Sequence, residues 1–257
     1  MDKIGIAITT RNRANTLDLC LQYYAAHLPS SDKYEYEFWV IHDACDQDYQ
    51  SVVSKYQFVK YHKNPERLGV AKSKNECLKR IKDCDYIFLM DDDVMPIRED
   101  WIDFFIDNYK RTGINHFMYI PNYDFLGIMH QKNGINIYSR HIGVLLFLTK
   151  EVIEKVGAFS TEGAAPWGHE HSNYTMRVNQ AGLNNGYGEC LSPDGVEKVM
   201  FSIDFEMNHF NQRPPLHSDL DIDQYRSTST PGEDHLRESW ARQNGVVLNV
   251  KRIYEPF

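Results

Sequence analysis

Residues 85–93 read DYIFLMDDD, and this stretch decides the fold class. Its apolar run, residues 86–90, has the length of a strand and is too continuously apolar for a strand with one face in water. Such strands are typical of parallel sheets that helices cover on both faces. Three adjacent carboxylates follow the run, namely Asp91, Asp92 and Asp93. We therefore expect them to gather at the carboxyl end of a buried strand.

Strands and helices alternate on the N-terminal side of this stretch. Strands are expected at residues 3–10, 36–43 and 57–63, and helices at 16–27, 48–56 and 69–82. Downstream, the pattern is less regular: strands are expected at 116–123, 139–150 and 199–207, and helices at 151–156 and 170–181. The alternation predicts an α/β fold whose mostly parallel sheet is flanked by helices, with a smaller mixed α+β part after it.

Composition narrows the class of protein. The chain has 257 residues and a net charge of -8, so it has no bulk attraction to nucleic acid or to anionic membranes. Its 5 cysteines form no C-x-x-C pair, which argues against a disulfide framework and a cysteine zinc site. No apolar run approaches the ~20 residues of a membrane span, and the N-terminus lacks the pattern of a signal peptide. A cytoplasmic protein is the simplest expectation.

The carboxylates predict a metal site. Adjacent anions raise one another's pKa unless a cation lies among them, and hard oxygen ligands suit Mg²⁺ or Mn²⁺. The alternative is a solvated acidic turn before the next helix. Other polar residues, Thr10, Arg11 and Asp43, also follow expected strands, where ligands of open α/β sheets bind.

Several ordered segments share a resemblance. They read IGIAITTRNRANTL, VIHDACDQD, RLGVAKSKNECL, YIFLMDDDVMP, LLFLTKEVIEKVGAFS and WGHEHSNYTMRVNQAG. Together they resemble the GT-A glycosyltransferases, in particular the large family-2-like group, over residues 4 to about 209. The Asp91-x-Asp93 pattern resembles that family's DxD element.

The resemblance implies a metal-dependent glycosyltransferase that uses a nucleoside-diphosphate sugar, with a UDP-sugar expected first. Mn²⁺ or Mg²⁺ would be held by Asp91, Asp93 and His209, although His209 can also be an ordinary strand histidine. The residues implied for the nucleotide sugar are Thr10, Arg11, Asp43, Lys74, Asp91, Asp92, Trp167 and Gly168. Lys74 stands where the family carries Arg, so it keeps the charge without the bidentate fork. Trp167 can stack on a sugar or anchor its loop.

The catalytic position departs from the family's pattern. Inverting relatives carry Glu-Asp, with the Asp as general base, whereas here Glu170 is followed by His171. Either residue could take the acceptor's proton, since both types serve as bases. Alternatively, the enzyme retains stereochemistry and Glu170 orients the sugar or acceptor.

The expected organisation is a GT-A domain over residues 1–210, with a nucleotide-binding half at 1–95 and an acceptor half at 96–210. Residues 211–257 would form an extension or lid. The acceptor is open: a glycan, a small molecule or a modified DNA base, although the acidic charge disfavours nucleic acid. The alternatives are a nucleotidyltransferase-like enzyme, which usually has a Gly-rich loop that TTRNRAN lacks, and a non-catalytic module that binds nucleotide sugars.

Overall fold

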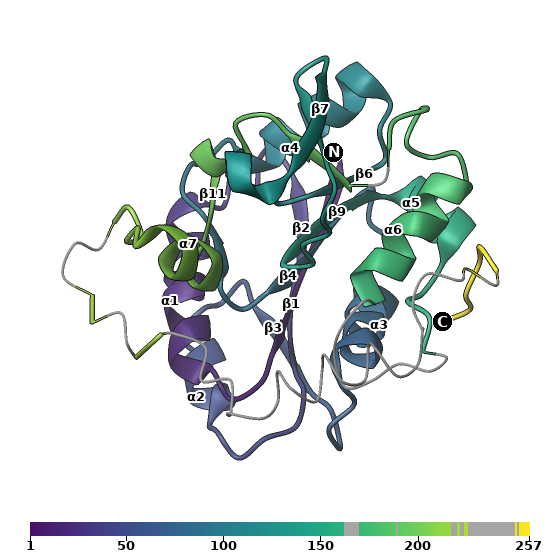
Figure 1. Ribbon diagram of the computed structural model, residues 1–257. Helices are drawn as coiled ribbons and strands as arrows, with labels where there is room; N and C mark the ends of the chain where they lie inside the picture. Colours follow the sequence, from purple (N-terminus) through teal and green to yellow (C-terminus); the bar gives the residue numbers. More distant parts are fainter. Residues whose placement is uncertain (162–169, 189, 217–219, 222–223, 226–249, 251) are drawn as a thin grey trace, which may run out of the picture.

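The computed structural model describes residues 1–161, 170–188, 190–216, 220–221, 224–225, 250 and 252–257. Its main sheet has the strand order β3-β2-β1-β4-β9-β6 (Figure 1). The parallel strands are β1 (Lys3–Thr10), β2 (Glu35–His42), β3 (Lys60–Lys63) and β4 (Tyr86–Asp91). β9 (Leu145–Thr149) is antiparallel to both of its neighbours, β4 and β6 (His116–Met118). The predicted mostly parallel α/β sheet is confirmed.

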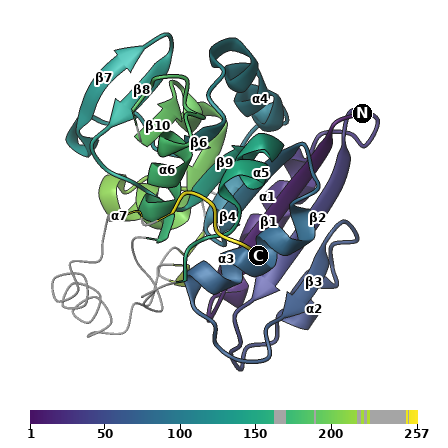
Figure 2. The same ribbon diagram turned by 90° about the vertical axis from the view of Figure 1, so that its right-hand side faces the viewer.

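Helices cover both faces of this sheet, as Figures 1 and 2 show. One face carries α1 (Ala14–His27), α2 (Tyr49–Val53) and α4 (Trp101–Thr112), and the other carries α3 (Val70–Ile81), α5 (Lys150–Val156) and α6 (Glu170–Gln180). The alternation along β1 explains this: Ile6 and Ile8 pack with α1, whereas Ala7 packs with α3. Gly5 lets α3 approach closely, because a Cβ there would lie 2.7 Å from Cβ of Ile81.

The second half of the chain adds smaller sheets. One has the order β10-β8-β7 and consists of β7 (Ile128–Lys132), β8 (Ile135–Tyr138) and β10 (Cys190–Pro193). Asn133 and Gly134 join β7 to β8 with φ of 52° and 66°, as a tight hairpin turn requires. The other pairs β5 (Val94–Pro96) with β11 (Met200–Ser202), and 3-10 helices lie at η1 (Asp124–Leu126) and η2 (Val196–Lys198). This is the mixed part that the sequence predicts.

The strand expected at residues 199–207 is wrong beyond its first half. β11 ends at Ser202, and α7 (Ile203–Phe210) follows. Ser202 caps this helix, since its Oγ accepts a hydrogen bond from the Phe205 amide at 3.3 Å. Asp204 and Glu206 lie in the first turn, where the helix dipole favours acids. The strands expected at 116–123 and 139–150 are also shorter, at β6 and β9.

The last residues return to the main body. Glu255 forms a parallel bridge with Gly157, just after α5, and its carbonyl accepts from the Ala158 amide at 2.9 Å. The buried Arg177 of α6 donates to the Ile253 carbonyl at 3.0 Å. The expected extension or lid at 211–257 falls mostly outside the described residues.

Helix length bears on membrane insertion. The longest described helix is α1, with 14 residues, or ~21 Å. A bilayer core is ~30 Å thick. Among the described helices, none is both long and apolar enough to cross it.

Candidate active site

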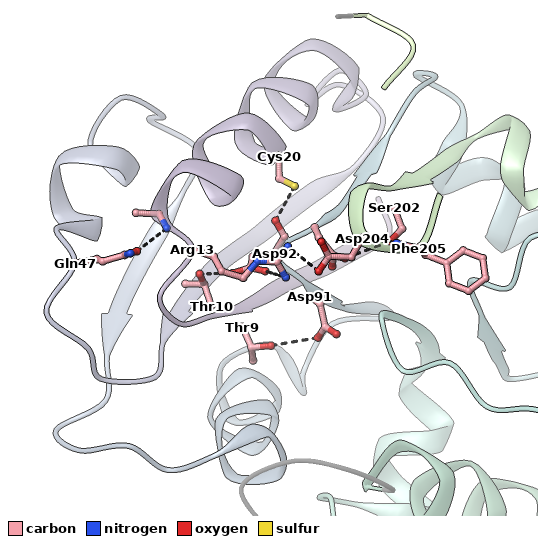
Figure 3. A network of polar contacts seen from close by, with 12 residues as sticks. Thr9, Thr10, Arg13, Cys20, Gln47, Asp91, Asp92, Ser202, Asp204 and Phe205 are labelled. Carbon is pink, nitrogen blue, oxygen red and sulfur yellow. Dashed lines mark hydrogen bonds and ion pairs between the residues drawn. The ribbon is translucent and has the colours of Figure 1, made fainter. Parts of the chain in front are cut away.

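The predicted polar residues meet at one edge of the main sheet. Thr10 is the last residue of β1, Asp43 directly follows β2, and Asp91 is the last residue of β4. β1 lies between β2 and β4 in parallel register, with Thr9 opposite Asp91. Figure 3 shows the Thr9, Thr10, Asp91 and Asp92 side chains close together. The structure thus brings the three strand ends together, as the sheet pattern predicts.

Asp92 is held by the protein itself. Its carboxylate accepts a hydrogen bond from Thr10 Oγ1 at 2.6 Å and lies 3.1 Å from a terminal nitrogen of Arg13 (Figure 3). Arg13 also lies 3.0 Å from Oδ2 of Asp204 in α7. Burial raises the pKa of Asp92 to about 7, with Arg13 opposing this rise and Asp93 adding to it. Since these contacts occupy both of its oxygens, Asp92 joins β1, β4 and α7 at the site.

Asp91 keeps more contact with solvent. Its side chain is 34% exposed, and its Oδ1 lies 3.1 Å from Nζ of the buried Lys74. Lys74 also donates to the Gly143 carbonyl at 2.8 Å. Burial would lower the pKa of Lys74, but the carboxylates of Asp91 and Glu170 outweigh burial and raise it. Lys74 is therefore a fixed positive charge beside Asp91.

Asp93 has an unusual environment for a carboxylate. It is 3% exposed, and its Oδ2 accepts from Ser202 Oγ at 3.3 Å. Its Oδ1 is buried and has no hydrogen-bond partner among the described residues. A buried oxygen without a partner is costly, and such an acceptor suits a hard cation.

The described side chains do not form a complete metal site. Among the residues that the structure describes, no group of three or more His, Cys, Asp or Glu is placed to hold an ion. Asp91 and Asp93 therefore offer a partial set of oxygen ligands. Mg²⁺ commonly binds one or two carboxylates together with substrate phosphates and water, so a partial set fits this type of cation.

Asp43 organises the loop before α3. Its Oδ1 accepts from the Leu68 amide at 2.6 Å and from Nδ2 of Asn64 at 3.2 Å. Its Oδ2 accepts from the Gly69 amide at 3.0 Å, where φ is 79°. Oδ2 keeps accepting capacity beyond its bond to the Gly69 amide, and its contact with a nucleotide base stays a prediction.

Arg11 brings positive charge to the same edge. Its Nε is buried without a hydrogen-bond partner in the described part of the chain. Burial lowers the pKa of His42, and the charges of Lys63 and Arg11 lower it further against the opposing effect of Asp43. Arg11 is therefore close to the end of β2, where it could meet an anionic ligand.

Glu170 and His171 begin α6. Nδ1 of His171 lies 3.4 Å from Oε1 of Glu170, and both side chains are largely buried. Burial would raise the pKa of Glu170, but His171 and then Lys74 outweigh it and lower the pKa to about 2. Gly143 makes room for the imidazole, since a Cβ there would lie 2.6 Å from the ring. Glu170 is thus ionised at neutral pH and placed to orient His171.

Other expected site residues lie elsewhere. Trp167 and Gly168 fall outside the described residues. His209 is in α7, exposed, with Nδ1 3.0 Å from the Phe205 carbonyl and its ring stacked near Phe125. The structure therefore gives His209 aromatic neighbours, and its role as a ligand stays a prediction.

Sequence reasoning missed the residues that support the acidic cluster. Arg13 and Asp204 bracket Asp92. The Tyr49 hydroxyl can donate to Thr10 Oγ1, 3.1 Å away, and accepts a hydrogen bond from the Arg13 amide at 2.8 Å. The second arginine of TTRNRAN was a visible signal, because it follows a strand end. Its partner in α7 could not be found, since that segment reads as a strand.

Comparisons with known proteins agree with this architecture. The chain matches the family described as "Glycosyl transferase family 2" over residues 5–159. A curated relative, an uncharacterized glycosyltransferase of Acanthamoeba polyphaga mimivirus, is 26% identical over 190 residues, which cover 68% of this chain and 72% of the relative.

Solved structures show the same fold. The mannosyltransferase PcManGT of Pyrobaculum calidifontis, in complex with GDP-Man and Mn²⁺, matches with a TM-score of 0.59 and 17% identity, over 76% of this chain and 55% of that one. S. aureus TarS 1-349 in complex with UDP-GlcNAc matches with a TM-score of 0.51 and 13% identity, over 68% and 52%. The chain spans about half the length of these structures.

The family match, the curated relative and the sheet order point the same way. The family match and the curated relative support a glycosyltransferase enzyme rather than a nucleotidyltransferase-like protein or a non-catalytic sugar-binding module. Because the matched residues make up more than half of the chain, the protein belongs to glycosyl transferase family 2 and has the GT-A fold.

Proposed function

We propose that this enzyme transfers a sugar from a nucleoside-diphosphate sugar to an acceptor, with Mn²⁺ or Mg²⁺ at Asp91 and Asp93. One observation carries the proposal: a buried oxygen of Asp93 without a described partner lies in an acidic cluster at the carboxyl end of β4. The similar structures, PcManGT with GDP-Man and Mn²⁺ and TarS 1-349 with UDP-GlcNAc, support this class of donor.

The cation site would use the two carboxylates that the protein leaves most available. Asp92 is occupied by Thr10 and Arg13, whereas Asp91 is partly exposed and Asp93 has an acceptor atom to spare. Diphosphate oxygens and water would complete the coordination. A cation bound there supplies positive charge for the diphosphate leaving group.

Positive side chains would hold the rest of the donor. Arg11 has a buried Nε to offer an anion. Lys74 lies 3.1 Å from Asp91 and opposes the rise that burial causes in the pKa of Asp91. Asp43 fixes the loop from Asn64 to Gly69, and its Oδ2 can accept a hydrogen bond from a base. The donor half would therefore lie within residues 1–95, with 96–210 supplying the acceptor side and 211–257 an extension.

The acceptor's proton would go to His171. A carboxylate with a pKa of about 2, as in Glu170, is a weak base at neutral pH. Nδ1 of His171 lies 3.4 Å from Oε1 of Glu170, so Glu170 can hold Nδ1 and leave Nε2 to take the proton. Glu170 is then a positioning residue and His171 the general base.

The test is thermal unfolding with UDP- and GDP-sugars, each with Mn²⁺, with Mg²⁺ and with EDTA. A specific donor at ~100 times its dissociation constant stabilises the fold by about 2.7 kcal/mol. We expect one nucleotide sugar to raise the melting temperature only when a divalent cation is present. No shift with any donor and either cation would refute the proposal, and a shift in EDTA would remove the cation from it.

A further inference from the structure

A cluster of aromatic rings lies between α7 and η1, and the donor site does not account for it. Its members are Tyr123, Phe125, Phe205, His209 and Phe210, called the aromatic cluster below. Ring centroids are 3.7 Å apart for Tyr123 and Phe210, 5.2 Å for Phe125 and Phe210, and 4.9 Å for Phe205 and His209. Segments far apart in the sequence thus build one aromatic surface.

This surface is open to solvent. Phe125 is 48% exposed and His209 is exposed. The two rings are nearly parallel, at 10° with centroids 5.8 Å apart. Exposed aromatic groups that are packed against one another commonly mark binding sites.

A hydrogen bond to Glu206 anchors Tyr123 of the aromatic cluster. Glu206 of α7 is 2% exposed and accepts hydrogen bonds from Tyr119 at 2.6 Å and from Tyr123 at 2.9 Å. A buried carboxylate is stable only with such partners. Glu206 therefore fixes Tyr123, and with it the ring that packs against Phe210, before any ligand binds.

The aromatic cluster is also joined to the acidic cluster. Ser202, the N-cap of α7, contacts the Asp93 carboxylate, and the Ile203 amide donates to the Asp93 carbonyl at 2.8 Å. His209 lies seven residues after Ser202 in the same helix, a rise of about 10 Å. A ligand that reaches Asp93 from this side would extend along α7 over the rings.

The charged residues around the aromatic cluster argue against an anionic ligand. The charged groups of η1 and α7 are Asp124, Asp204 and Glu206, and neither element contains Lys or Arg. Anionic chains such as nucleic acids need positive contacts for their phosphates. An uncharged ring with an apolar face meets no such requirement.

We propose that the aromatic cluster binds a sugar ring of the acceptor, with the apolar face of the ring stacked on Phe125. This inference rests on the proposed function, because the acceptor is placed relative to Asp93. It makes a carbohydrate the acceptor class and assigns Phe125 a role in recognising it.

The experiment is saturation-transfer NMR on the full chain with Mn²⁺ replaced by diamagnetic Mg²⁺, in the presence of UDP or GDP. The probes are methyl β-D-glucopyranoside, methyl β-D-galactopyranoside, methyl α-D-mannopyranoside and, as a nucleic acid, a short oligothymidylate. Phe125→Ala and Phe125→Trp are compared with Met129→Ala, because Met129 is an apolar side chain of β7 that is 71% exposed. Nucleotide binding is measured on the same samples.

We expect at least one glycoside to receive saturation on the protons of one ring face. Loss of the stacked ring should weaken its binding about two- to tenfold in Phe125→Ala. Phe125→Trp should keep binding because it keeps an aromatic face, and Met129→Ala should match the original protein.

The inference would be overturned if no glycoside binds a protein that binds nucleotide, if Phe125→Ala binds the glycoside as well as the original protein does, or if oligothymidylate binds in a Phe125-dependent manner. Self-association that Phe125→Ala abolishes would identify a second copy as the occupant and overturn it too. A protein that binds a glycoside in a Phe125-dependent manner but binds no nucleotide would instead contradict the proposed function and leave the aromatic cluster as a sugar site.

Discussion

Replacing Asp93 with Asn should stabilise the metal-free protein and abolish its response to metal and donor. The carboxylate is 3% exposed, with one oxygen bound to Ser202 and the other without a described partner. It lies in sequence beside two more carboxylates, Asp91 and Asp92. Asn keeps the shape and an oxygen for Ser202, removes one negative charge from the cluster, and offers a donor to its neighbours.

The substitution should change two stabilities in opposite directions: it should raise that of the metal-free protein and remove the stabilisation by metal and donor. A buried charged group without a partner costs about 1–3 kcal/mol or more, so the metal-free variant should gain stability of that order. For a chain of this size, each kcal/mol corresponds to about 2–4 °C in melting temperature. Saturating donor and cation should add about 2.7 kcal/mol at 100 times the dissociation constant to the original protein, and nothing to Asp93→Asn.

The assay is thermal unfolding of both proteins in EDTA and in Mn²⁺ with the nucleotide sugar that binds. Asp83→Asn is the matched control, because it makes the same chemical change at an exposed position, where stability should change by less than about 0.5 kcal/mol. A metal-free Asp93→Asn that melts below the original protein would refute the reasoning about the unpartnered oxygen. A retained response to metal and donor would remove Asp93 from the proposed cation site.

Further predictions concern the acceptor side, the core and the C-terminus. His171→Asn should lower turnover by about 100-fold or more at unchanged donor affinity, with a smaller loss in Glu170→Gln; steady-state kinetics that show equal losses, or none, would contradict these roles. Burial lowers the pKa of His116 in the folded protein to about 4. Below about pH 6.5 the unfolded chain therefore binds a proton that the folded protein does not bind. The free energy of unfolding should fall by up to about 1.4 kcal/mol per pH unit between about pH 6.5 and pH 4. Urea unfolding should therefore show that His116→Gln loses less stability between pH 7 and pH 4.5 than the original protein does. An equal loss in the two proteins would count against this prediction. In Gly157→Ala, a Cβ would lie 2.0 Å from the Glu255 carbonyl oxygen at a φ of 73°, so the C-terminal bridge should break; hydrogen exchange at the Glu255 amide measures this, and unchanged protection would show that the bridge adapts.

The parallel half of the fold could be predicted because its signals are local. Residues 3–10 and 86–91 are short apolar runs bounded by polar turns, and each is a buried strand. The helices between them repeat apolar positions near a period of 3.6. The carboxyl ends of such strands must share one edge, so the placement of Thr10, Asp43 and Asp91 followed from the order of elements.

The sequence did not predict helix α7, because its apolar residues fit both the period of a strand and the period of a helix. Apolar residues alternate at Ile203, Phe205 and Met207, which indicates a strand, yet Ile203 and Met207 are also four apart and both are buried in one face of the helix. The Ser202 cap and the acidic first turn favour the helix. A period-2 pattern that begins at Ser with acids next to it should therefore be considered as a possible helix start.

The long-range contacts of the site could not be predicted from the sequence for a different reason. Asp43 looked like a base-binding residue, but its carboxylate also accepts the amides of Leu68 and Gly69. Neither contact has a residue-type signal, because any residue offers a backbone amide. The pairing of Arg13 with Asp204 likewise depends on where α7 lies.

These contacts bear on how donor and acceptor would be coupled. Asp92 is bound through Arg13 to Asp204, and Asp93 is bound to Ser202, so consecutive carboxylates of one cluster hold the start of α7. A cation that draws Asp93 towards a diphosphate must act on the helix that carries Phe205, His209 and Phe210 of the aromatic cluster. Because packed elements shift as units rather than bending freely, donor binding and acceptor binding should each raise the affinity for the other by the same factor. Glycoside binding that is identical with and without UDP or GDP and Mg²⁺ would show that α7 does not couple the two sites.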